Sequence, residues 1–180
     1  MINNLLQKYR KEVAPALMAE FGYKNIMQVP RIKKVIINVG SGRFAKDAAF
    51  LENIDNTLKK ITGQKPVRTK AKKAISNFKI RENMDIGAMV TLRGKVMYDF
   101  LERMLDITLP RTRDFRGISA KSFDRSGNYT LGFKENSAFP ELGSAEIDKV
   151  HGLEVVINIQ AKNQEEGRAL LTKLGFPFKK

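Results

Sequence analysis

The sequence contains no cysteine and a single histidine, His151, among its 180 residues. Disulfides, thiolate nucleophiles and cysteine metal sites are therefore excluded, and so is any site that needs two histidine ligands. His151 lies in "DKVHGLEV", a context that suggests the start of a strand more than the setting of a general base. We therefore expect no catalytic residue, no metal site and no enzymatic activity.

Long apolar runs and targeting signals are also lacking. No stretch approaches the roughly 18 consecutive apolar residues of a membrane-spanning helix. The N-terminal segment "MINNLLQKYRKEVAPALMAEF" has neither the continuous apolar core nor the cleavage site of a signal peptide. Glu12 and Glu20 argue against an organellar transit peptide. We expect a cytoplasmic protein with no membrane partner, and the absence of cysteine is compatible with that compartment.

What the chain does have is positive charge. It carries 33 Lys and Arg against 19 Asp and Glu, a formal net charge of +14. This excess is larger than solubility requires of a small domain, and such a field attracts polyanions, of which nucleic acid is the favoured class. No Gly/Ser-rich or Pro-rich linker interrupts the sequence, and its length suits one core, so we expect a single domain over residues 1–180.

Hydrophobic periodicity predicts four helices and at least four strands. Apolar residues recur at helical spacing in four segments, and one of these helices should stop before Pro110. Alternation of apolar and polar residues marks the strands. The expected helices cover about 5–22, 51–62, 96–109 and 164–174, and the expected strands cover 33–40, 86–93, 128–133 and 153–161.

Each predicted strand has one apolar face and one mixed face. The mixed faces carry Asn38, Thr91, Thr130 and Asn158 among larger side chains such as Met89. Helices packed on the apolar side of the sheet would leave the mixed side open to a partner. The alternative is an ordinary solvated sheet face, which antiparallel sheets commonly present to water.

A glycine motif at the end of the first strand raises a different possibility. Gly40, Gly42 and Ala45 fit G-x-G-x-x-G/A, the fingerprint of dinucleotide-binding proteins. The region that should supply a ribose-binding carboxylate reads "TGQKPVRTKAKK" and has none, although its basic residues do not exclude NADP. Strands and helices do not alternate as a doubly wound sheet requires, and no P-loop motif is present. We expect no cofactor and no small-molecule substrate, with the glycines forming a tight turn.

The positive charge is concentrated in one run, residues 65–81, which contains no acidic residue. The run could be a solvated loop that aids solubility, but like charges gathered without counter-charges favour a polyanion contact. Phe78 would either stack on a base or anchor the loop. The basic residues of the run are Lys65, Arg68, Lys70, Lys72, Lys73, Lys79 and Arg81.

A second basic group surrounds Phe115. Its guanidinium groups could bind phosphate or the carboxylates of a partner protein, and Asp114 in its midst makes a protein partner as plausible as RNA. The group consists of Arg111, Arg113, Arg116 and Lys121.

The sequence resembles the bacterial family of large-subunit ribosomal proteins that bind 5S rRNA, the fifth protein in the usual series. The resemblance is carried by "LKKITGQKPVRTKAKKA" and by four flanking segments, which agree in order and without large gaps over nearly the whole chain. These segments are "MQVPRIKKVIINVG", "AISNFKIRENMDIGAMVTLRG", "RDFRGISAKSFDRSGNYTLGF" and "EEGRALLTKLGFPFKK".

The resemblance implies an α+β fold, an open antiparallel sheet with helices packed on one face and 5S rRNA on the other, plus a basic protruding loop at residues 68–81. It implies a structural role in the large ribosomal subunit, contact with large-subunit rRNA and attachment of 5S rRNA in the central protuberance. It places rRNA contacts at Asn38, Gln64 and Thr91, with Lys34 and Arg93 as neighbours.

The resemblance also implies two further partners. The loop would contact peptidyl-site tRNA, and a small-subunit head protein would meet Arg111, Arg113, Arg116 and the segment "ENSAFPELGSAEI" at residues 135–147. The segment after Pro140 departs from the commoner family pattern. The expected tRNA-contact residues are Arg68, Lys70, Lys72, Lys73, Asn77, Lys79 and Arg81.

Two other classes of function remain open to comparison. A free-standing single-strand RNA module would need aromatic side chains on the open sheet face, where the sequence places Asn, Thr, Met and Arg. An NADP oxidoreductase would need the strand and helix alternation that the sequence lacks.

Overall fold

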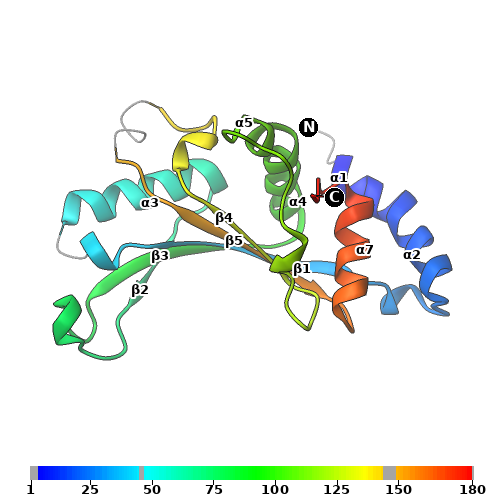
Figure 1. Ribbon diagram of the computed structural model, residues 1–180, viewed down its shortest axis with the longest axis horizontal. Helices are drawn as coiled ribbons and strands as arrows, with labels where there is room; N and C mark the ends of the chain where they lie inside the picture. The colour runs from blue at the N-terminus through cyan, green and yellow to red at the C-terminus, as the bar shows by residue number, and fades with distance from the viewer. Residues whose placement is uncertain (1–3, 45–46, 144–148, 180) are drawn as a thin grey trace. The chain divides into compact units, whose positions relative to one another are not determined.

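The computed structural model describes residues 4–44, 47–143 and 149–179 (Figure 1). Its strands form one open antiparallel sheet in the order β2-β3-β1-β5-β4, and helices accompany it, which confirms the predicted α+β class. This antiparallel order contradicts a doubly wound dinucleotide-binding fold, whose strands are parallel. The strands are β1 (Arg31–Gly40), β2 (Val67–Lys70), β3 (Asp85–Leu92), β4 (Tyr129–Phe133) and β5 (Leu153–Gln160).

The described residues group into two compact units. Unit 1 draws on Met1–Val35, Leu92–Leu131 and Val156–Lys180, and unit 2 draws on Ile36–Thr91 and Gly132–Val155. The expectation of a single domain stays a prediction. No helix in the described ranges is long and apolar enough to cross a membrane.

Three of the helix ends lie at the residues that mark them in the sequence. Gly22 and Gly63 end α2 and α3 with φ of 66° and 71°, the left-handed conformation typical of a helix C-terminus. Asn163 caps α7 by accepting a hydrogen bond from the Glu166 backbone N–H at 3.0 Å. The helices are α1 (Asn4–Lys8), α2 (Ala14–Phe21), α3 (Ala48–Thr62), α4 (Gly94–Arg103), α5 (Leu109–Arg111) and α7 (Gln164–Leu174), with short 3-10 turns at Ile26–Gln28, Gly42–Phe44, Ser76–Phe78, Ala120–Ser122 and Asn136–Ala138.

Two π-helical turns interrupt the helices, η1 (Tyr9–Val13) and η5 (Met104–Thr108). The prediction that the third helix stops before Pro110 is wrong, because the chain stays helical through η5 and α5 to Arg111. A proline ring clashes with the carbonyl four residues earlier, and the wider π turn, in which Leu109 N–H bonds to Met104 O, relieves that clash. The same arrangement precedes Pro15, where Ala14 N–H bonds to Tyr9 O.

In unit 2, α3 lies along one side of β1 and β3 (Figure 1). The apolar side of these strands is fully buried, with Ile37 and Val39 at 0 % exposure, and the α3 side chains Ile54, Leu58 and Ile61 at no more than 1 %. At about 25 cal/mol per Å² of apolar surface, this burial is the main stabilising contribution in the unit. The predicted alternation along β1 and β3 is confirmed.

The strand β2 lies within the run that the sequence predicts to be a basic loop. Residues Val67–Lys70 pair with β3 in antiparallel register, with Val67 opposite Met89 and Thr69 opposite Gly87. The alternating β-branched Val67 and Thr69 were the available signal, and the density of positive charge obscured it.

Gly87 of β3 faces the backbone of β1 with no room for a side chain. A Cβ atom built there would lie 2.6 Å from Val39 O and 2.9 Å from Thr69 Oγ1. Because the first of these is backbone, Gly87→Ala should cost about 1–3 kcal/mol of unfolding free energy through overpacking. Gly132→Ala in β4 is the matched control, since nothing lies within 4 Å of a Cβ atom there. Urea denaturation of both variants checks the prediction, and equal stability would contradict it.

Candidate nucleic-acid interface

In unit 2, Asn38 and Thr91, two of the residues predicted to bind rRNA, lie on the side of the strands that faces away from α3. Ser41 N–H bonds to Ile86 O at 2.8 Å, so the antiparallel ladder places Asn38 opposite Met89 and Ile36 opposite Thr91. Opposite residues share a face. We call this surface the open face, and its residues are Ile36, Asn38, Val67, Thr69, Gly87, Met89 and Thr91.

The open face combines exposed apolar side chains with polar side chains that make no hydrogen bond within the described residues. Val67 is 63 % exposed and Met89 is 37 % exposed, while Asn38 and Thr91 are half-buried beside them. Within the described chain, neither the Asn38 amide nor the Thr91 hydroxyl makes a hydrogen bond, so both remain available to a partner. Amide and hydroxyl groups in such positions can donate to phosphate oxygens and pair with ribose 2′-hydroxyls.

Gln64 is held at the edge of this face by the end of α3. Thr62 Oγ1 donates to Leu58 O at 2.6 Å and accepts from Gln64 N–H at 3.2 Å, which fixes the turn after Gly63. The Gln64 side chain then donates to Thr91 O at 3.4 Å. The structure therefore brings two of the predicted rRNA-binding residues, Gln64 and Thr91, into contact, and the β1–β3 pairing adds Asn38 to the same surface.

The other two predicted rRNA neighbours belong to unit 1. Lys34 of β1 is half-buried, and Arg93, which directly follows β3, is exposed. Asn158 of β5 already has a hydrogen-bond partner within unit 1, because its side-chain amide donates to Asn128 Oδ1 at 2.8 Å.

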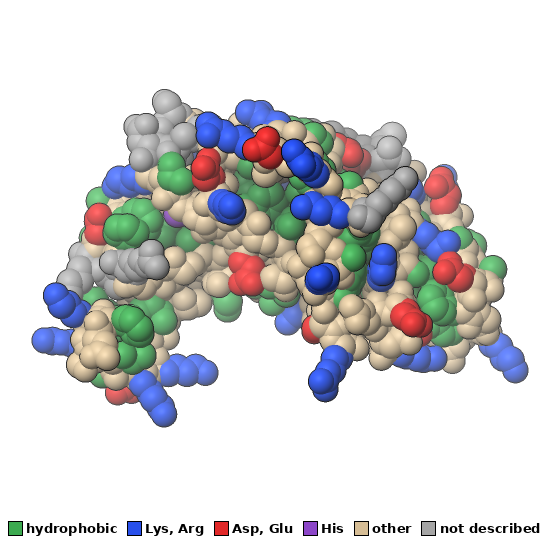
Figure 2. All heavy atoms as spheres, in the orientation of Figure 1, with side chains coloured by type: hydrophobic (Ala, Val, Ile, Leu, Met, Phe, Trp, Pro, Cys, Tyr) green, Lys and Arg blue, Asp and Glu red, His purple; other side chains and the backbone are tan. Residues whose placement is uncertain are grey.

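The basic run continues beyond β2 as a compact hairpin tip, residues 71–84. Ala71 N–H bonds to Met84 O at 2.9 Å, and Ile75 and Ile80 exchange two backbone hydrogen bonds at 2.9 and 3.1 Å. Phe78 is 70 % exposed at the end of the tip. Lys and Arg side chains project from this part of the molecule (Figure 2). The exposed members of the predicted tRNA-contact set here are Lys72, Lys73, Asn77, Lys79 and Arg81, and Lys70 is exposed at the end of β2.

Arg68 differs from the rest of that set. Its guanidinium lies 2.8 Å from Asp55 Oδ2 of α3 and 3.4 Å from Asp85 Oδ2 of β3. The hydrogen bond to Asp55 raises the pKa of Arg68 above its already high value. The side chain is 42 % exposed, so the ion pairs stabilise the fold by about 1 kcal/mol at most. Arg68 thus ties β2 to α3, and its contact with tRNA stays a prediction.

The second basic group lies in a loop of unit 1. Arg111, Arg113 and Arg116 are all exposed, and Phe115 between them is half-buried. Backbone hydrogen bonds fix the end of this loop to the C-terminal segment. Ile118 N–H donates to Pro177 O at 2.8 Å, and Lys179 N–H donates to Ile118 O at 2.9 Å. Of the other segment predicted to meet a small-subunit protein, residues 135–143 are described and 144–147 lie outside the described residues.

The described residues form neither a dinucleotide-binding turn nor a metal site. Gly40, Ser41 and Gly42 lead into a 3-10 turn and not into a phosphate-binding helix, and Ala45 of the motif lies outside the described residues. Among the residues with described positions, no group of three or more His, Asp or Glu side chains could hold a metal ion.

His151 is a core residue of unit 2. It is 7 % exposed, its ring packs edge-on against Phe50 at 6.0 Å, and Nδ1 lies 3.0 Å from Lys149 O. Burial lowers the pKa of His151 below its ordinary value of 6.5. The unfolded chain therefore binds this proton more readily than the folded chain does.

His151 should make the stability of the protein depend on pH. Its contribution is fully present above about pH 6.5 and is lost as the pH falls through the lowered pKa of the folded state. His151→Gln should flatten the fall in unfolding free energy between about pH 7 and pH 5, measured by urea titration. A variant with the same pH slope as the parent protein would show that His151 is not responsible.

Fold and surface together define a class, the basic α+β proteins that present a sheet face and a charged hairpin to a polyanion. A family model described as "Ribosomal protein L5" matches residues 25–81, and one described as "ribosomal L5P family C-terminus" matches residues 85–178. The chain is similar to the large ribosomal subunit protein uL5 of Brevibacillus brevis, with 53% identity over 180 residues that span the whole of both chains.

The chain belongs to the ribosomal protein L5 family. This confirms the resemblance found in the sequence, and it confirms the prediction of a structural, non-enzymatic protein. A nicotinamide enzyme is excluded by the antiparallel sheet and by this membership.

Proposed function

We propose that the protein is a structural constituent of the large subunit of the cytoplasmic ribosome and that its open face binds 5S rRNA. The observation that carries the proposal is the pair of uncommitted polar side chains, Asn38 and Thr91, on an exposed sheet face edged by Gln64. Family membership and the name of the Brevibacillus brevis relative support the ribosomal setting.

The polar groups of the open face would set register on the RNA, and basic side chains would supply much of the affinity. Lys34 and Arg93 of unit 1 are also proposed to bind rRNA. The face carries no aromatic side chain among its seven residues, which favours recognition of a folded RNA surface over stacking of splayed bases. Binding here would attach 5S rRNA to the large-subunit rRNA in the central protuberance.

The hairpin tip is proposed to contact peptidyl-site tRNA. Its exposed Lys72, Lys73, Lys79 and Arg81 would bind phosphates, with Phe78 available for stacking. Arg111, Arg113 and Arg116 are proposed to meet a small-subunit head protein, since arginine forks pair with carboxylates as well as with phosphates.

Direct binding tests the proposal. Purified protein is titrated with 5S rRNA and with an unrelated structured RNA across a salt series. Each phosphate contact contributes a slope of about 0.7–0.9 in log K against log salt, so both affinities fall with salt. The proposal expects the preference for 5S rRNA to persist at moderate salt. Equal affinity for both RNAs at every salt concentration would contradict it.

A further inference from the structure

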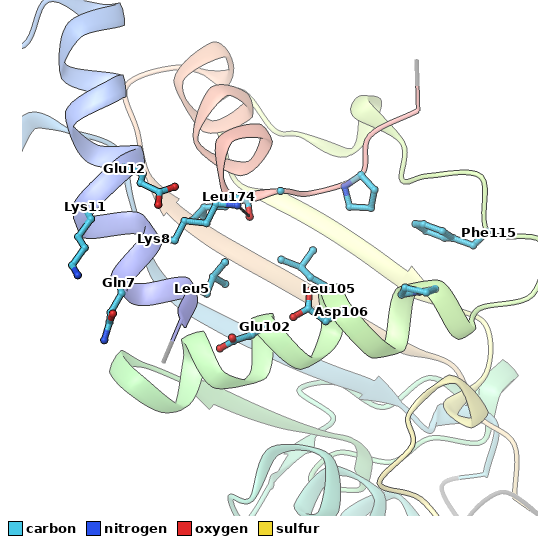
Figure 3. Close-up of a pocket in the computed structure, with 13 residues that line it drawn as sticks. Leu5, Gln7, Lys8, Lys11, Glu12, Glu102, Leu105, Asp106, Phe115 and Leu174 are labelled. Atoms are coloured by element: carbon cyan, nitrogen blue, oxygen red, sulfur yellow. Dashed lines mark hydrogen bonds between the residues drawn. The ribbon is translucent and has the colours of Figure 1, made fainter. Parts of the chain in front are cut away.

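Unit 1 contains a groove that is separate from the surfaces described above. Only Phe115, which lies within the second basic group, also lines the groove. The groove has a volume of about 770 Å³ and is open to solvent. One wall is formed by α1 and η1, the other by α4, η5 and α5, and the end of α7 closes it (Figure 3). We propose that this groove binds a basic segment of another protein that carries apolar side chains.

Both long walls of the groove contain a π-helical turn. Lys11 and Glu12 come from η1, and Leu105 and Asp106 come from η5. Such turns make up well under 1 % of residues in globular proteins and are frequent at functional sites. Both of these turns line one groove, and Pro15 and Pro110 hold them in place by preventing a regular α-helical turn.

The charge of the groove is opposite to that of the chain. In a protein of formal net charge +14, the lining carries three carboxylates, Glu12, Glu102 and Asp106, and two ammonium groups. One of these, Lys8, donates to Leu174 O at 3.4 Å, where a cation stabilises the C-terminal end of α7. Figure 3 shows the carboxylates of Glu102 and Asp106 directed toward α1, over the space between the walls.

This chemistry fits a basic peptide and not RNA. Three carboxylates around one opening repel phosphates, while they can pair with Arg or Lys side chains through charge-assisted hydrogen bonds. Leu5 and Leu174 form an apolar floor, at 6 % and 2 % exposure, and half-buried Leu105 and Phe115 leave apolar surface for a partner side chain. An extended segment with alternating basic and apolar residues satisfies both features.

The experiment uses the full-length protein and a fluorescein-labelled peptide of about 12 residues in which Arg and Leu alternate, followed by fluorescence anisotropy. Two control peptides separate the two features. A peptide in which Glu and Leu alternate tests the need for positive charge, and one in which Arg and Gly alternate tests the need for apolar side chains. The proposal expects the Arg–Leu peptide to bind at least about fivefold more tightly than either. No binding of the Arg–Leu peptide, or equal binding of the Arg–Gly peptide, would overturn it.

Matched variants locate the binding. Glu102→Gln combined with Asp106→Asn should weaken peptide binding about fivefold or more, because it removes two carboxylates from the groove. Glu52→Gln combined with Glu82→Gln makes the same charge change at exposed residues outside the lining and should alter binding less than about twofold. If both pairs weaken binding equally, the peptide is held by general charge alone and the proposal fails.

A second pair tests the apolar part. Leu105→Ala should weaken binding about threefold, while Ile107→Ala, on the same turn but outside the lining and 42 % exposed, should not. Circular dichroism confirms that each variant is folded. Affinity for 5S rRNA is measured in parallel and should be unchanged by the groove variants, so this inference fails or stands independently of the proposed rRNA binding. Displacement of the peptide from the groove by single-stranded RNA would identify RNA as the occupant and overturn the proposal.

Discussion

Replacing Asn38 and Thr91 together with alanine is expected to lower the affinity for 5S rRNA about a hundredfold. Each side chain is proposed to make one hydrogen bond to a charged phosphate, and such a bond contributes about 1.5 kcal/mol, or roughly tenfold in affinity. Neither side chain makes a hydrogen bond within the described part of the protein, so the double variant should fold normally. Filter binding at moderate salt, with thermal unfolding as the check on folding, measures the effect.

The matched control is Asn56→Ala combined with Thr172→Ala. Both residues are exposed, Asn56 on α3 and Thr172 on α7, where its hydroxyl donates to Arg168 O of the same helix. These changes remove the same chemical groups away from the open face and should alter the affinity less than about twofold. If the control lowers affinity as much as Asn38→Ala with Thr91→Ala does, the open face is not the RNA-binding surface.

Neutralising the hairpin tip should have the second large effect. Lys72, Lys73, Lys79 and Arg81 are exposed, and their replacement by Gln removes up to four phosphate contacts. At about 0.7–0.9 per contact, the slope of log K against log salt for tRNA should fall by about 3, which corresponds to about a thousandfold in affinity near 0.1 M salt. The measurement is a tRNA titration at four salt concentrations.

A control with the same loss of charge separates the tip from the net charge. Lys24, Lys59, Lys121 and Lys179 are exposed at other places on the chain, and their replacement by Gln should change the slope for tRNA by less than about 1. The tip variant should keep its preference for 5S rRNA over an unrelated RNA. A tip variant with an unchanged salt slope for tRNA would remove the hairpin from the proposed tRNA contact.

Local signals in the sequence predicted much of the fold. Alternation along β1 and β3 identified which face is buried, and Gly22, Gly63 and Asn163 marked helix ends because their effects depend only on neighbouring residues. Asn38 and Thr91 could be assigned to one kind of face for the same reason. Their proximity to Gln64 depends on strand pairing, which periodicity alone does not reveal.

Features created by contacts between distant residues were missed. The strand β2 is short and highly charged, and its pairing with β3 prevails over a composition typical of a loop. Arg68 looked equivalent to the neighbouring lysines, but Asp55 and Asp85 engage it from two other elements. The helix past Pro110 continues because a π turn accommodates the proline, an option that the general rule for proline does not include.

Site-specific photo-crosslinking shows which side of unit 2 contacts the RNA. The photoreactive residue p-benzoylphenylalanine replaces Met89 at the centre of the open face, and in a second sample it replaces Asn56 on α3. After irradiation with 5S rRNA, we expect a crosslink from position 89 and none from position 56. A crosslink from position 56 with none from position 89 would place the RNA on the helical side of unit 2 and show that the open face does not bind it.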